Sequence, residues 1–245
     1  MRRIRNLLLY AGGAVVALTA FIASILAWPS PLFAFSLGNG KVVVASDKPL
    51  PVDGATQFIN ACEALLARSP LKATGQHYRV YIANADWRTT LVFVANPDAG
   101  GIAYQALGRH VFLSGANFET GELVKRGYHI KAPRTLAYYC AHELTHIVIA
   151  EHIGMTGLFH LPTWVGEGLP DYVGIEERQS FEQLRAAIGD HSADLPMMRA
   201  YGVYAPYRLL VTYFLEKRGW SVGDLLKTRL TFDQAKSLMR NAGDL

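Results

Sequence analysis

The sequence is poor in the residues that mark several common classes of protein. It has only 2 cysteines in 245 residues, and charged residues make up only 18% of the chain. The two cysteines, Cys62 and Cys140, are too far apart for a CxxC motif and fit no metal-ligand spacing. We expect two buried thiols, with a disulfide as the alternative in an oxidising compartment.

Net positive charge is also small outside the N-terminus. The formal net charge is +4, and Arg2, Arg3 and Arg5 contribute three of the positive charges. The remaining charges nearly balance, so no basic surface for nucleic acid is expected, and we predict no nucleic-acid partner. The length of the chain suits one sizeable domain.

One long hydrophobic run is present, at the N-terminus. Residues 7–28 are uncharged and mostly apolar, and a helix of about 20 such residues spans a bilayer. The preceding arginines favour an N-terminus that stays inside and a domain that is extracytoplasmic, or periplasmic in a bacterium. Trp28 would lie at the far interface. We favour an uncleaved single-pass anchor over a cleaved signal peptide, whose apolar core is normally about 7–15 residues long.

The rest of the chain divides into a strand-rich and a helix-rich half. After an anchor at 1–28, residues 29–40 contain Pro, Ser and Gly and are expected to be a linker, which leaves a domain at 41–245. Strands are expected at 41–45, 77–83, 91–95, 102–105 and 110–114, and helices at 54–68, 134–153, 163–177, 180–188, 203–218 and 232–241. This order predicts an α+β domain with a small N-terminal mixed or antiparallel sheet.

The helix expected at 134–153 carries the motif His142-Glu143-Leu144-Thr145-His146. Residues four apart lie on one face of a helix, so the two imidazoles can bind one Zn²⁺ ion. Glu143 would then be the general base that takes a proton from water. The helix is apolar on several sides, which indicates burial, and buried polar groups are costly without partners. A metal ion is the simplest partner for this group.

A catalytic zinc needs a third protein ligand and an open position. Glu167 follows His146 by 21 residues and falls in the first turns of the next helix, for which Thr163 is the expected cap. Asp171 lies four residues further on the same face and could accept a hydrogen bond from the outer nitrogen of a ligand histidine. Pro170 is expected to kink or shorten this helix.

A metzincin pattern is the alternative source of a third ligand, because His152 stands six residues after His146. That pattern needs a glycine that breaks the helix, and Ile149 occupies its place. On an unbroken helix His152 points away from His142. We therefore expect His152 at the surface near the end of the helix, where the helix dipole stabilises its charge.

HELTH followed by LPTWVGEGLPDYV resembles the gluzincin peptidases, especially the small bacterial peptidase MA-like domains. The resemblance covers about half of the chain and implies a mainly helical, thermolysin-like zincin lobe after the sheet. It matches His142 and His146 to the ligand histidines. It matches Glu143 to the general base and Glu167 to the third ligand.

The same resemblance extends to two further features. Residues 110–114 match the strand along which a gluzincin substrate lies, and Tyr204 matches a tyrosine that faces the oxyanion. The lysine-glycine pair that follows this tyrosine in the family is absent here, so Tyr207 is kept as an alternative donor. His160 and His191 are weaker candidates.

These features predict a zinc metallopeptidase with one Zn²⁺ per chain, a peptide or protein substrate, and a membrane anchor through residues 7–28. Two alternative functions are kept. A catalytically inactive zincin-like binding or scaffold domain would keep the metal but would not need Glu143. A zinc amidase acting on a non-peptide or cell-wall substrate would use the same residues, because the chemistry depends on carbonyl polarisation and not on substrate identity.

Overall fold

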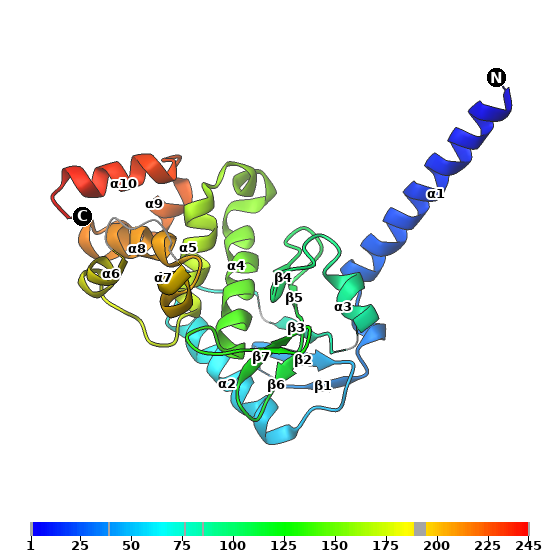
Figure 1. Cartoon of the computed structure of the whole chain (residues 1–245), viewed down its shortest axis with the longest axis horizontal. Helices are drawn as coiled ribbons and strands as arrows, with labels where there is room; N and C mark the ends of the chain where they lie inside the picture. The colour runs from blue at the N-terminus through cyan, green and yellow to red at the C-terminus, as the bar shows by residue number, and fades with distance from the viewer. Residues whose placement is uncertain (1, 39, 76, 85, 189–194, 245) are drawn as a thin grey trace.

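A computed structural model describes residues 2–38, 40–75, 77–84, 86–188 and 195–244. It shows a mixed α and β structure preceded by one apolar helix, α1 (Arg2–Ala27), which projects away from the body of the molecule (Figure 1). Over Leu9–Ala27 this helix is long and apolar enough to cross a membrane, and only 6% of its most apolar window is buried inside the protein. The predicted apolar N-terminal helix is confirmed, and its length and composition fit a membrane span or a signal sequence.

A five-stranded mixed sheet forms the first part of the domain, in the order β1-β2-β3-β5-β4. The inner strands β2, β3 and β5 are parallel, whereas β1 and β4 are antiparallel edge strands. Because the inner strands are covered on both faces, they are apolar nearly throughout and show little alternation. The strands are β1 (Phe35–Leu37), β2 (Val42–Ser46), β3 (Tyr78–Ile82), β4 (Gly101–Ala103) and β5 (His110–Leu113).

A second, three-stranded antiparallel sheet follows, and the sequence analysis missed it. Its strands are β6 (Ala116–Asn117), β7 (Glu122–Lys125) and β8 (Tyr128–Ile130). They have 2, 4 and 3 residues and are too short to show a period.

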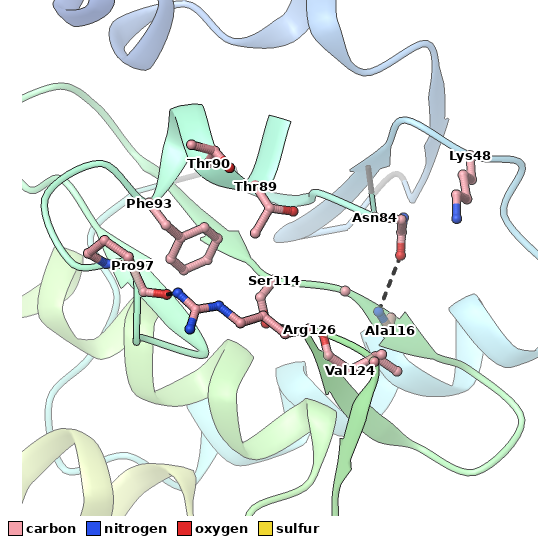
Figure 2. Close-up of a pocket in the computed structure, with 12 residues that line it drawn as sticks. Lys48, Asn84, Thr89, Thr90, Phe93, Pro97, Ser114, Ala116, Val124 and Arg126 are labelled. Atoms are coloured by element: carbon pink, nitrogen blue, oxygen red, sulfur yellow. Dashed lines mark hydrogen bonds between the residues drawn. The ribbon is translucent and has the colours of Figure 1, made fainter. Parts of the chain in front are cut away.

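Asn84, directly after β3, joins the two sheets. Its Oδ1 accepts a hydrogen bond from the backbone nitrogen of Ala116 at 3.4 Å (Figure 2), and its Nδ2 donates to Ser46 and Asp47. The cavity in Figure 2, of about 560 Å³, lies beside this contact, and none of the predicted metal ligands lines it. Because the Asn84 amide is already bonded to the protein, we assign it a structural role.

Two predictions for the N-terminal half are wrong. Within the described residues, the expected linker at 29–40 contains a 3-10 turn, Ser30–Leu32, and the edge strand β1, and Phe33 is buried. Phe33 packs on the sheet, and this packing outweighs the turn-forming composition. Residues 91–95, expected as a strand, include the end of helix α3 (Asp86–Val92). A short apolar run cannot be distinguished from a buried helix by its period alone.

Helices α2 (Val52–Ala67) and α4 (Leu136–His160) pack against the sheet and each other, and the helices that follow α4 in the chain lie beyond it (Figure 1). The predicted helices of this half are present, and the one expected at 203–218 is α8 followed by a π-helical turn. α7 and α9 were not predicted. The elements after α4 are α5 (Thr163–Gly174), α6 (Phe181–Ile188), α7 (Leu195–Tyr201), α8 (Ala205–Thr212), the turn Tyr213–Lys217, α9 (Val222–Lys227) and α10 (Phe232–Asn241).

Gly154 does not end α4 as its position in the sequence suggested. Its backbone is non-helical, with φ of +66°, but the chain resumes a helical path and continues to His160. A glycine adopts this left-handed conformation at little steric cost. The result is a kinked helix of 25 residues whose first part carries the HExxH motif.

Cys62 of α2 and Cys140 of α4 form a disulfide, so the expectation of two thiols is wrong. Both residues are fully buried in the core between the two helices. They are 78 residues apart, and only the packing of α2 against α4 brings their sulfur atoms together.

Candidate metal centre

The HExxH residues and Glu167 lie on two helices that pack side by side, α4 and α5 (Figure 1). Thr135 caps α4 by accepting a hydrogen bond from the backbone nitrogen of Tyr138. Pro162, not Thr163, occupies the cap position of α5 and makes no side-chain cap, so that prediction is wrong. Pro162 has an extended backbone, and Thr163 is the first residue of the helix. α5 continues through Pro170 to Gly174.

The three predicted metal ligands meet between these helices. The Oε2 atom of Glu167 lies 3.5 Å from Nε2 of His142 and 3.7 Å from Nε2 of His146. One potential ligand atom from each residue lies within 4.8 Å of the others. In a tetrahedral site with bonds of about 2.0–2.1 Å, two ligand atoms are roughly 3.4 Å apart. The group is therefore spaced to hold a metal ion.

This centre lies at the wall of a cavity of about 480 Å³ between α4, β4 and the start of α8. His142 and Glu143 are buried, whereas the side chains of His146 and Glu167 are 14% and 27% exposed. The buried side of the centre is protein, and its other side faces the cavity. This is the geometry that a site open to a substrate requires.

Burial and nearby charges shift the pKa values of the four groups. Burial raises the pKa of Glu143 to about 7, although His142 acts in the opposite direction. Burial, together with the charge of His142, lowers the pKa of His146 to about 4. Glu143 can therefore accept a proton near neutral pH, and His146 is neutral there.

The shifts of His142 and Glu167 have a common cause. Burial is the largest single influence on the pKa of His142 and lowers it, but the hydrogen bond to Glu167 and the nearby negative charges together outweigh burial and raise it. Burial likewise opposes ionisation of Glu167, but the same hydrogen bond and the two histidines lower the pKa of Glu167 to about 2. The proton that a metal ion would displace is therefore held on His142, facing the carboxylate.

Asp171 does not form the predicted hydrogen bond to a histidine. Its Oδ1 accepts from the hydroxyl of Tyr138 and its Oδ2 from Arg208, each at 2.5 Å. Within the described residues, the buried Nδ1 of His142 has no hydrogen-bond partner. The carboxylate is turned away because Arg208 is only 1% exposed and its charge needs a partner. Asp171 contacts the centre only through Tyr138, whose ring packs against His142 with centroids 5.5 Å apart.

Tyr204 lies at the centre and Tyr207 does not. The ring of Tyr204 stacks on His142, with centroids 5.5 Å apart, and its hydroxyl is hydrogen-bonded to Glu167. Burial, then the negative charge of Glu167, raises the pKa of that hydroxyl. Tyr207 stacks behind Tyr204 and packs on Phe232, and it does not line the cavity.

Two of the other histidine candidates, His152 and His160, are not in this site. His152 is exposed, and its Nδ1 is bonded to the backbone oxygen of Val148 on the same helix. His160 is exposed at the end of α4. His191 lies outside the described residues. The predicted surface position of His152 is confirmed.

The strand beside the centre is β4, not residues 110–114. β5, which occupies that range, is hydrogen-bonded to β3 on one side and to β4 on the other, so it has no free edge for a substrate. β4 lies at the edge of the sheet and lines the cavity. The prediction failed because sequence shows a strand but not its neighbours.

Two glycines at the start of β4, Gly100 just before the strand and Gly101 in it, and one tyrosine of α4 belong to the site but were not predicted. A Cβ on Gly101 would lie 2.6 Å from Cγ of Glu143, and one on Gly100 would lie 2.9 Å from the ring of Tyr139. Tyr139 stands four residues before Glu143, on the same face of α4. The sequence did carry a signal, because glycine in a strand often marks a close approach of another element.

A scan of the chain against protein-family models found no match, and a search among curated proteins found none.

Proposed function

We propose that the protein is a zinc-dependent peptidase of the gluzincin type, with one Zn²⁺ held by His142, His146 and Glu167. The observation that supports it best is the donor set and its spacing. Two imidazole nitrogens and one carboxylate oxygen suit zinc, and they lie at separations of 3.5 and 3.7 Å. Three protein ligands beside an open cavity are typical of catalytic zinc, whereas structural zinc usually has four protein ligands.

Glu143 and Tyr204 have the positions that the proposed reaction needs. Zinc, when bound, polarises a substrate carbonyl and makes a water molecule more acidic. Glu143, with a pKa of about 7, takes the proton of the attacking water and delivers it to the leaving amine. The hydroxyl of Tyr204 keeps its proton because its pKa is raised. It can donate a hydrogen bond to the oxyanion that forms on the substrate.

The free edge of β4 supports a peptide as the substrate. An extended peptide adds to an exposed sheet edge through main-chain hydrogen bonds. Gly101 places this edge directly beside Glu143. A peptide bound in this way would pass over the general base, which favours a peptidase over an amidase for non-peptide substrates.

We further propose that α1 is a single-pass anchor, with its N-terminus inside and the metal-binding domain on the extracytoplasmic side. Arg2, Arg3 and Arg5 precede the apolar span, as the positive-inside rule requires. The disulfide between Cys62 and Cys140 also supports this side of the membrane, because disulfides persist in oxidising compartments.

The substitution Glu143→Gln tests the proposal against a scaffold that only binds metal. The purified full chain should contain one zinc per molecule and hydrolyse casein or a peptide library. Glu143→Gln should keep the zinc and lose about 10²–10⁴-fold of the activity, because it removes the general base. Zinc is measured by elemental analysis and hydrolysis by mass spectrometry of the products.

His146→Ala should lose both zinc and activity, and His152→Ala on the exposed part of the same helix is its matched control. Wild-type protein without bound zinc contradicts the proposal. Bound zinc without hydrolysis of any peptide indicates the scaffold alternative, and cleavage of cell-wall amides alone indicates the amidase.

A further inference from the structure

The last turns of α1 are part of the folded domain. Leu26 is only 5% exposed and packs with Phe33, Tyr81 and Phe112 on the face of the sheet opposite α2 and α4. Ile22, one turn earlier, packs partly against the same cluster. A signal sequence that is removed cannot contribute to the core of the mature protein. The burial of Leu26 therefore favours a helix that is retained.

A buried histidine binds the C-terminal end of α1. Nε2 of His110, on β5, lies 2.7 Å from the backbone oxygen of Leu26. The last carbonyl groups of a helix have no partner within the helix, and here the sheet supplies one. His110 itself is only 7% exposed, so cutting the chain after α1 would leave a buried polar group without its partner.

Side chains of the domain also bind the segment that follows α1. Arg79 donates a hydrogen bond to the hydroxyl of Ser30 at 3.0 Å, and Arg88 donates from Nε to the backbone oxygen of Leu32 at 2.9 Å. Phe33 then enters the core. The apolar span is therefore joined to the sheet without a flexible linker, and the domain has a set position relative to the span.

Helix α3 lies beside the end of α1 (Figure 1), and two large apolar side chains of the α3 region are exposed. Trp87 of α3 is 55% exposed, and Val94, two residues after the end of α3, is 50% exposed. The guanidinium of Arg88 lies 4.3 Å from the centre of the Trp87 ring and also binds Leu32. Trp87 is thus attached to the segment that leaves the span, where Trp28 is 75% exposed.

We propose that α1 stays attached to the mature protein and that Trp28, Trp87 and Val94 form a membrane-contact surface. Its partner is the lipid bilayer, at the boundary between headgroups and acyl chains. The surface is continuous with the apolar face of α1, which only lipid can cover over its length. Tryptophan favours this boundary. The metal-binding domain then rests on the membrane in one orientation.

Quenching by brominated lipid tests the contact surface in the full chain. The protein is placed in phosphatidylcholine nanodiscs with or without bromine on the acyl chains. The fluorescence of Trp87 is obtained by subtracting the emission of the Trp28→Phe/Trp87→Phe protein from that of the Trp28→Phe protein. We expect most of this emission to be lost in brominated lipid. Trp220, in the helical half, is the control. Its fluorescence, obtained by the same kind of subtraction with Trp220→Phe, should be equal in brominated and unbrominated lipid. Equal Trp87 emission in the two lipids overturns the proposal that this surface contacts the membrane. That holds even if the surface binds another protein instead.

The mass of the mature chain tests retention of α1. A chain with a C-terminal tag, produced in a host with a secretory pathway and recovered from its membranes, should have the mass of the whole sequence. A mature chain that begins anywhere between residues 27 and 35 overturns the proposal. Both tests are independent of zinc and of hydrolysis, so a failure of the proposed enzymatic function leaves them unaffected.

Discussion

The two faces of the five-stranded sheet come from alternate residues of the same strands, yet they have opposite surroundings. Val80 and Ile82 of β3 face the main core under α2 and α4, and Tyr81 between them faces the small cluster closed by Leu26. The main core continues into the helical half and surrounds the buried polar groups of the candidate metal centre. The small cluster depends on a helix that lies largely outside the domain. The first face therefore borders the candidate metal centre, and the second packs against the end of the apolar helix.

The largest effect on stability should come from the buried ion pair beside the main core. Asp171→Ala leaves the charge of Arg208, which is 1% exposed, without a partner. Removal of one member of a buried pair costs about 3–5 kcal/mol of unfolding free energy, measurable by chemical denaturation. Asp98→Ala is the matched control, because the Asp98–Arg126 pair is exposed, and its effect should be far smaller. Similar effects from the two variants would contradict the assigned burial of Arg208.

The disulfide should give the second largest effect, again on the first face. Cys62→Ala/Cys140→Ala removes the link between α2 and α4 and should lower the unfolding free energy by about 2–4 kcal/mol, because the unfolded chain becomes less restricted. Denaturation with and without a reducing agent measures this. The reductant should destabilise the wild type and leave the double variant unchanged; an equal response would show that the bond is not formed.

On the second face, Leu26→Ala should destabilise the domain although it lies at the end of the apolar span. The loss should be about 2–3 kcal/mol, at the low end for a buried leucine, because the small cluster can close partly around the gap. Thermal unfolding in detergent micelles measures it. Leu18→Ala, at a residue that is 59% exposed on the same helix, should leave the domain unchanged. If the two variants behave alike, the cluster does not need α1.

The smallest effect is the pH dependence of zinc binding, which involves only the first face. A metal ion must displace the proton of His142, whose pKa is raised above 6.5, whereas His146 has a pKa of about 4 and is already neutral. Between these two pKa values, zinc affinity should rise about tenfold per pH unit, or about 1.4 kcal/mol. It should level off above the pKa of His142. Calorimetric titration at several pH values measures the slope, and a hundredfold rise per unit would mean that both histidines lose protons.

Local patterns in the sequence predicted most single elements and the central part of the site. The HExxH motif specified its own geometry, because four residues make one helical turn and both histidines then face one way. The apolar length of α1 likewise needed no partner to be recognised. Glu167 was predicted from a second motif, and the position of α5 beside α4 confirms its approach to the histidines.

Contacts between distant segments were predicted less well. Asp171 was placed beside a histidine because it lies one turn after Glu167, but its direction depends on Arg208 from another helix. The edge strand beside Glu143 was assigned to residues 110–114 because neighbours in a sheet cannot be read from one strand. The pairing of Cys62 with Cys140 and the packing of residues 29–40 were wrongly predicted for the same reason, because both depend on contacts with distant segments.

The sequence by itself determined an apolar span, a helix with two histidines on one face, and a carboxylate one helix later. Each follows from spacing within a single segment, where the backbone period decides which side chains are neighbours. Only the tertiary structure decided which strand borders the candidate metal centre, where Asp171 points, and that one side of the last turns of α1 packs on the sheet. Those outcomes depend on how helices and strands pack across long stretches of chain, and packing is decided by shape and burial that no local pattern contains.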